Sequence, residues 1–177
     1  DKLIDITSDD TFLAGVYYSR GDAFTGMQDW KSALRSYLKS YELEPDGNYA
    51  AKALKASYQT ALMPLNENNF ELAIIQFDSL INVIPSGPLL TAAHYSKGDA
   101  FSELEEWKAA GKSYLESFKL EPDGKYAAKA LMNVGISLGK MQKINEACNI
   151  LNRVEARFPR NQIVEEAQYE MQILGCS

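Results

Sequence analysis

The chain repeats its own sequence at a fixed interval. Residues 17–54 align without a gap onto residues 94–131, and 24 of the 38 aligned pairs are identical. The offset is 77 residues throughout, as for Trp30 and Trp107. A self-match at constant period is typical of repeat arrays, which bind partners along a surface more often than they carry out chemistry in a pocket.

Each copy contains two shorter repeats. An alanine lies 12 residues before a proline four times, at Ala33–Pro45, Ala73–Pro85, Ala110–Pro122 and Ala147–Pro159. Four residues after each alanine stands a large side chain (Tyr37, Phe77, Tyr114, Leu151), and Gly21, Gly98 and Gly135 lie 12 residues before three of the alanines. This pattern resembles the tetratricopeptide repeat, a helical hairpin with small residues at the helix crossing and a proline after the second helix.

The resemblance implies an all-α fold: a right-handed superhelical solenoid of about four helical hairpins followed by a C-terminal capping helix. Apolar residues at helical spacing after Asp29 and Glu106 favour the same elements independently. We expect an N-terminal arm at 1–9, four repeats within 10–161 (about 11–47, 48–87, 88–124 and 125–161) and a capping helix at 162–177.

The second repeat departs from the pattern. Tyr58 stands where the other repeats have glycine, and three extra residues separate it from Ala73. Pro64 falls within the expected first helix of this repeat. Because proline lacks an amide hydrogen and clashes with the preceding turn, we expect it to kink or end that helix.

Charge and hydropathy exclude several classes of protein. The formal net charge is −6 and the isoelectric point about 4.9, which argues against nucleic acid or an anionic membrane as partner. No run of 18 apolar residues occurs, so no membrane span is expected. The first residues do not form a signal peptide, which leaves open a leader or N-terminal domain that has been removed.

The two cysteines indicate a disulfide. If residues 145–157 and 163–174 form an antiparallel helix pair that turns near residue 161, facing residues have numbers that sum to about 322. Cys148 and Cys176 sum to 324. The alternative is two free thiols, with Cys148 as a small core residue. A disulfide would indicate an oxidising compartment.

Residues 66–176 also resemble a narrower family. The matching stretches are NNFELAIIQFDSLINVIPSGPLLTAAHY, then KYAAKALMNVGISLGKMQKINEACNILNRVEARFP, then a short helix ending in Gly175-Cys176. They are similar to the periplasmic Tol–Pal accessory proteins that coordinate cell division, called YbgF or CpoB. The pairing of Ala147-Cys148 with the terminal Gly-Cys is the most specific element.

This resemblance implies a scaffold in the periplasm of the bacterial cell envelope, with TolA or the peptidoglycan synthesis machinery as partner. The alternatives are a lipoprotein subunit of an outer-membrane assembly machine of the BamD type, or another tetratricopeptide adaptor. A cytoplasmic location stays open.

Little in the sequence indicates catalysis. His94 is the single histidine, and no partner for acid–base chemistry is evident beside it. No histidine, cysteine or acidic cluster has metal-ligand spacing, and no phosphate-binding glycine motif occurs. We therefore predict that the protein is not an enzyme and that it uses neither cofactor nor metal.

Partner binding is expected on the concave face, which in such repeats is lined by the first helix of each hairpin. The candidate groove residues are Tyr18, Asp22, Lys52, Lys55, Gln59, Tyr95, Asp99, Lys129 and Met132. The alternative is that they only pack or face water. The acidic net charge favours an extended or helical peptide with some basic residues as ligand.

Overall fold

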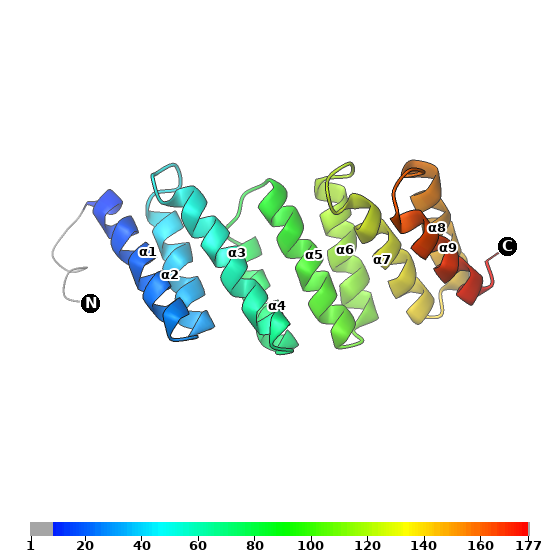
Figure 1. The fold of residues 1–177 in the computed structure, drawn as a ribbon, viewed down its shortest axis with the longest axis horizontal. Helices are drawn as coiled ribbons and strands as arrows, with labels where there is room; N and C mark the ends of the chain where they lie inside the picture. Colours follow the sequence, from blue (N-terminus) through cyan, green and yellow to red (C-terminus); the bar gives the residue numbers. More distant parts are fainter. Residues whose placement is uncertain (1–8, 177) are drawn as a thin grey trace. The chain divides into compact units, whose positions relative to one another are not determined.

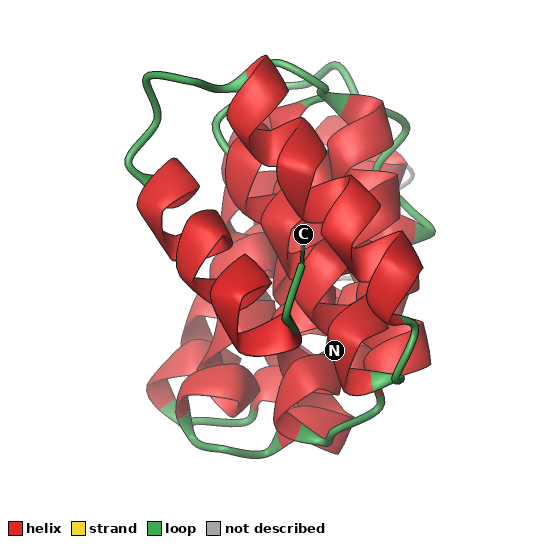
Figure 2. Ribbon diagram, turned by 90° about the vertical axis from the view of Figure 1, so that its right-hand side faces the viewer, coloured by secondary structure: helices red, strands yellow, loops and turns green. Residues whose placement is uncertain are grey.

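The computed structural model describes residues 9–176, and within this range all regular structure is α-helical (Figures 1 and 2). The predicted arm at 1–9 lies, apart from Asp9, outside the described residues. The helices are α1 (Asp10–Gly26), α2 (Trp30–Leu43), α3 (Ala50–Asn66), α4 (Phe70–Ile81), α5 (Pro88–Glu103), α6 (Trp107–Leu120), α7 (Ala127–Lys140), α8 (Ile144–Arg157) and α9 (Ile163–Leu174).

The chain divides into two compact units. The first ends at Pro85 and contains α1–α4, and the second begins at Ser86 and contains α5–α9. Consecutive helices in each unit pair into antiparallel hairpins, α1 with α2, α3 with α4, α5 with α6 and α7 with α8, and α9 follows the last hairpin (Figure 1). The predicted all-α helical-repeat architecture is confirmed.

Glycines allow the two helices of three hairpins to approach closely. A Cβ atom added to Gly21 would lie 2.5 Å from the ring of Tyr37, and one added to Gly98 would lie 2.6 Å from the ring of Tyr114. These tyrosines are 3% and 2% exposed. The conserved glycine-to-large-residue spacing of the sequence repeat therefore reflects contact across the hairpin.

The same tyrosines fix the hairpins through hydrogen bonds. The Tyr37 hydroxyl donates to Asp22 Oδ1 at 2.8 Å, and the Tyr114 hydroxyl donates to Asp99 Oδ1 at 2.8 Å. A serine one turn further along the second helix adds a buried bond to the first helix, from Ser117 Oγ to the Thr91 carbonyl oxygen at 3.0 Å. Residues that recur at the 77-residue interval therefore form hydrogen bonds between the two helices of a hairpin.

The second repeat absorbs its three extra residues by lengthening a helix. Helix α3 has 17 residues where α7 has 14. The expectation that Pro64 ends this helix is wrong, because α3 continues to Asn66. Pro64 lies in the last turn, where its carbonyl oxygen still accepts a hydrogen bond from the Asn69 amide at 2.8 Å. The missing amide hydrogen therefore affects only one bond near the helix end.

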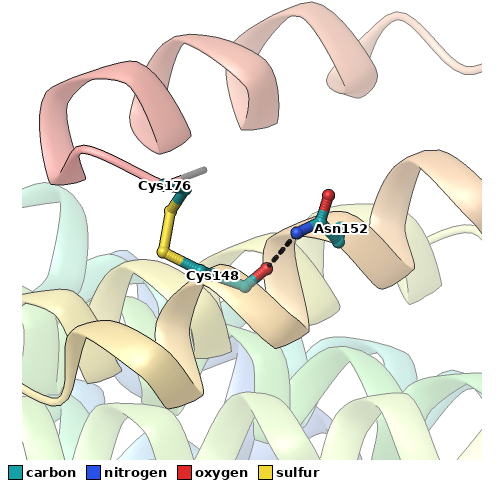
Figure 3. The surroundings of a disulfide bond; sticks show 3 residues. All are labelled: Cys148, Asn152 and Cys176. Atoms are coloured by element: carbon teal, nitrogen blue, oxygen red, sulfur yellow. Dashed lines mark hydrogen bonds between the residues drawn. A yellow bond between two sulfur atoms is a disulfide. The ribbon is translucent and has the colours of Figure 1, made fainter.

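The predicted capping helix and its disulfide are both present. Helix α9 packs on α8 and α7, and Leu174 lies against Gly139. Cys176, just after α9, is bonded to Cys148 on α8, and their Cα atoms are 5.6 Å apart (Figure 3). The side-chain Nδ2 of Asn152 donates a hydrogen bond to the Cys148 carbonyl oxygen at 3.0 Å. The end of α9 is therefore covalently held against the last hairpin.

Candidate functional site

The first helices of the second unit form one surface with α9, which we call the α5–α7–α9 surface. It holds four of the predicted groove residues together with side chains from the capping helix. Its residues are Tyr95, Asp99, Lys129, Met132, Asn133, Ile136, Glu165, Glu166, Tyr169 and Glu170.

Tyr95 lies at the centre of a cluster of aromatic rings. Its ring centroid is 5.4 Å from that of Tyr114 and 4.9 Å from that of Tyr126, on which it stacks. The hydroxyl accepts a hydrogen bond from Asn133 Nδ2 at 3.2 Å, and the Lys129 ammonium lies 6.0 Å from the ring centroid. Burial and the nearby Asp99 carboxylate raise the pKa of Tyr95. The tyrosine stays neutral and acts as a rigid hydrogen-bonding centre.

Asp99 is half-buried beside this cluster. Burial raises its pKa to about 6, although the hydrogen bond from Tyr114 and the positive charge of Lys129 act in the opposite direction. The Tyr114 hydroxyl also lies 3.0 Å from Ser102 Oγ, so this hydroxyl contacts two polar side chains. Asp99 therefore titrates near the acidic end of the physiological range.

We expect the free energy of unfolding to fall as the pH rises from about 4 to about 6, because the folded state holds a proton on Asp99 that the unfolded chain releases. The loss should be about 1–3 kcal/mol. Asp99→Asn keeps an acceptor for Tyr114 and should remove this part of the pH dependence in urea unfolding series. Asp22→Asn, the exposed equivalent in the first unit, is the matched control and should leave it in place. An identical pH dependence in Asp99→Asn and wild type would contradict the assignment.

A hollow of about 440 Å³ opens between α7 and α9. Met132 and Ile136 on α7 and Tyr169 on α9 give it apolar walls. Glu165, Glu166 and Glu170 line it from α9. The hollow thus combines an apolar floor with three carboxylates, a combination that suits a ligand with both apolar and cationic groups.

Burial changes the role of two predicted groove residues. Tyr95 and Met132 are 6% and 4% exposed and belong to the hydrophobic core of the second unit. They offer little area of their own and instead shape the surface. Lys129 is exposed and Asp99 is partly accessible, so these two remain available to a ligand.

The equivalent positions in the first unit are arranged differently. The Tyr18 ring packs between two tyrosine rings, as Tyr95 does, with its centroid 5.5 Å from those of Tyr37 and Tyr49. Tyr18 is nevertheless only partly buried. Three other predicted groove residues of this unit, together with Asp22, are exposed: Lys52, Lys55 and Gln59. Among the described residues of this unit, 9–85, no capping helix adds acidic groups.

The contribution of α9 to this surface was not predicted from the sequence. The helix was expected only as a cap, and Glu165, Glu166, Tyr169 and Glu170 were not among the candidate residues. A signal was present, because the segment Ile163–Leu174 contains three glutamates and no lysine or arginine. What the sequence could not show is that these glutamates face Met132 and Ile136.

The described residues offer no evident chemistry. Within 9–176 no group of three or more histidine, cysteine, aspartate and glutamate side chains is placed to hold a metal ion. His94 is half-buried on α5. None of the helices in this range is long and apolar enough to cross a membrane.

Comparison with solved structures defines the class of fold. No protein-family model matches the sequence, and no curated protein is similar to it. The structure is nevertheless similar, over nearly its whole length, to helical-repeat proteins of known structure, one of which is described as a tetratricopeptide-repeat (TPR) protein. The predicted tetratricopeptide-like fold is thus supported by structure.

Three of these structures illustrate the likeness. RapI in its apo form matches with a TM-score of 0.66 at 14% identity, over 98% of this chain and 51% of RapI, so the chain spans about half the length of RapI. YrrB, described as a TPR protein with an unusual peptide-binding site, matches with 0.61 at 18% identity, over 98% and 80% of the two chains. MamA from Desulfovibrio magneticus RS-1 matches with 0.57 at 15% identity, over 95% and 89%.

Proposed function

We propose that this chain is a non-catalytic protein-interaction module that binds a segment of a partner protein on its α5–α7–α9 surface. The observation that carries the proposal is the hollow between α7 and α9, with Met132 and Ile136 below and three glutamates on α9. The peptide-binding site named for the structurally similar YrrB supports this mode of action.

The chemistry of the hollow specifies the ligand. An extended or helical segment with one apolar side chain would bury that side chain against Ile136 and Tyr169, with the buried Met132 at the base of the hollow. Flanking lysine or arginine side chains would pair with the carboxylates of α9. Because these carboxylates are solvent-accessible, the electrostatic part of the affinity should weaken as salt is added.

A labelled peptide with one leucine between arginines tests the proposal by fluorescence anisotropy. Glu166→Gln combined with Glu170→Gln should weaken binding by about tenfold, which corresponds to 1.4 kcal/mol. Glu105→Gln combined with Glu106→Gln removes the same charge from an exposed turn of the same unit and is the matched control. Equal affinities of the two variants, or equal binding of a glutamate-flanked peptide, would rule out this surface.

We further propose that the partner belongs to the bacterial cell envelope and that the protein acts in the periplasm. Two observations support this: the resemblance of residues 66–176 to Tol–Pal accessory proteins, and the disulfide between Cys148 and Cys176, which suits an oxidising compartment. On this proposal the partner is TolA or the peptidoglycan synthesis machinery, and the protein coordinates Tol–Pal function with cell division.

Purified TolA tests the specific partner. Binding that is lost in the Glu166→Gln, Glu170→Gln variant would support the proposal, and absence of binding to folded wild type would refute it. A lipid-attachment cysteine in the precursor would instead favour the outer-membrane assembly lipoprotein.

A further inference from the structure

A second hollow, on the first hairpin, has the opposite charge to the α7–α9 hollow. It has a volume of about 390 Å³, and all its lining residues come from α1 and α2. Its lining includes the apolar side chains of Tyr17, Phe24 and Leu38 and the cationic side chains of Arg20, Arg35 and Lys39. We call it the α1–α2 face.

The positive charge of this face stands out in an acidic chain. Three cationic side chains line it against one carboxylate, Glu42, which pairs with Lys39 at 3.5 Å. The Arg20 guanidinium lies 5.5 Å from the centroid of the Phe24 ring, so charge and apolar area are presented together. A ligand for this face should combine carboxylates with exposed apolar groups.

The chain itself carries such a ligand in α9. Tyr169 and Ile173, one turn apart, are 62% and 61% exposed, among the most exposed large hydrophobic side chains of the described residues. Glu165, Glu166 and Glu170 lie on the same helix, which has no lysine or arginine to offset them. Large apolar side chains exposed side by side often mark an interaction site.

We propose that copies of this protein associate head to tail, with α9 of one copy seated on the α1–α2 face of another. Carboxylates of α9 would pair with Arg20, Arg35 and Lys39, and Tyr169 and Ile173 would cover the partly exposed rings of Tyr17 and Phe24. Because the two surfaces differ, the contact is heterologous, and repetition generates a ring or an open chain of copies. The inference shares α9 with the proposed peptide site but does not depend on partner binding.

Sedimentation velocity over a concentration series tests the proposal with two variants. Arg35→Glu with Lys39→Glu reverses charge on the α1–α2 face, and Tyr169→Ser with Ile173→Ser removes the apolar groups of α9. All four side chains are exposed, so both variants should fold. We expect wild type to form species larger than two copies or a closed ring, whereas each variant alone stays monomeric.

The decisive measurement is the mixture of the two variants. Each variant retains the surface that the other lacks, so an equimolar mixture should form a one-to-one pair and nothing larger. The control is Lys108→Glu with Lys112→Glu. It makes the same change in charge at the same helical spacing on α6, and this variant should associate like wild type. Added salt should weaken association of wild type.

Several results would overturn the proposal. A monomeric wild type at all concentrations would do so, as would association that the α1–α2 variant leaves unchanged. A mixture that fails to pair would indicate a contact other than head to tail. Association that appears only after residues 1–8 are removed would assign the α1–α2 face to the chain's own first residues. The α1–α2 variant should still bind the arginine-flanked peptide, which separates failure of this inference from failure of the proposed function.

Discussion

Gly98→Ala is expected to lower the free energy of unfolding by about 2 kcal/mol, although alanine is the better helix former by about 1 kcal/mol. The added Cβ atom would lie 2.6 Å from the Tyr114 ring. The ring cannot easily move aside, because the Tyr114 hydroxyl is bonded to Asp99 and the side chain is 2% exposed. The strain must therefore be taken up by separating α5 from α6.

Gly26→Ala provides the matched control. Gly26 is the last residue of α1, and no atom lies within 4 Å of the Cβ atom that alanine would add. This substitution should be neutral or stabilise by up to about 1 kcal/mol. Urea unfolding followed by circular dichroism compares the two. If both variants are equally stable, the close helix contact at Gly98 is not a determinant of the hairpin.

Cys176→Ser is expected to cost about 3–4 kcal/mol, because the disulfide closes a loop across 28 residues and restricts the unfolded chain. The loss should appear first in α9, the last described helix, which packs on α7 and α8. Amide hydrogen exchange should therefore rise in Ile163–Leu174 well before it rises in α5–α7. The Cys148→Ser, Cys176→Ser double variant should behave like the single variant.

The same variant links stability to the candidate site. The three carboxylates that line the hollow beside Met132 all belong to α9. Loosening this helix should therefore also weaken binding of the arginine-flanked peptide. Labelling with a thiol reagent under denaturing, non-reducing conditions is the direct check of the bond. Reaction of both cysteines in wild type would show that the disulfide is absent in the protein.

Features encoded by local sequence could be predicted. The Asp29 side chain accepts a hydrogen bond from the Ser32 amide and begins α2 where expected, since a carboxylate can satisfy a free amide of the first turn. The capping helix was predicted at Ile163–Leu174 and lies there. The cysteine pairing followed because an antiparallel helix pair fixes which residue numbers face each other.

Features that depend on the packing of several helices could not be predicted from the sequence. Tyr95 was selected as a groove residue from its repeat position, yet its burial depends on Tyr114 and Tyr126, which come from other parts of the chain. Asp99 was also selected from its repeat position, and only the structure shows that its carboxylate accepts a hydrogen bond from the Tyr114 hydroxyl. That α3 continues past Pro64 was not predictable from the proline alone, because its effect depends on how close it lies to the helix end.

The sequence by itself determined the helical-repeat fold and indicated which cysteines could pair, because spacing along the chain carries helix periodicity, helix crossings and antiparallel register. Only the tertiary structure decided which side chains are available for binding. Burial and charge at a surface are sums over neighbouring helices, so the acidic hollow between α7 and α9 and the basic α1–α2 face exist only once those helices are packed.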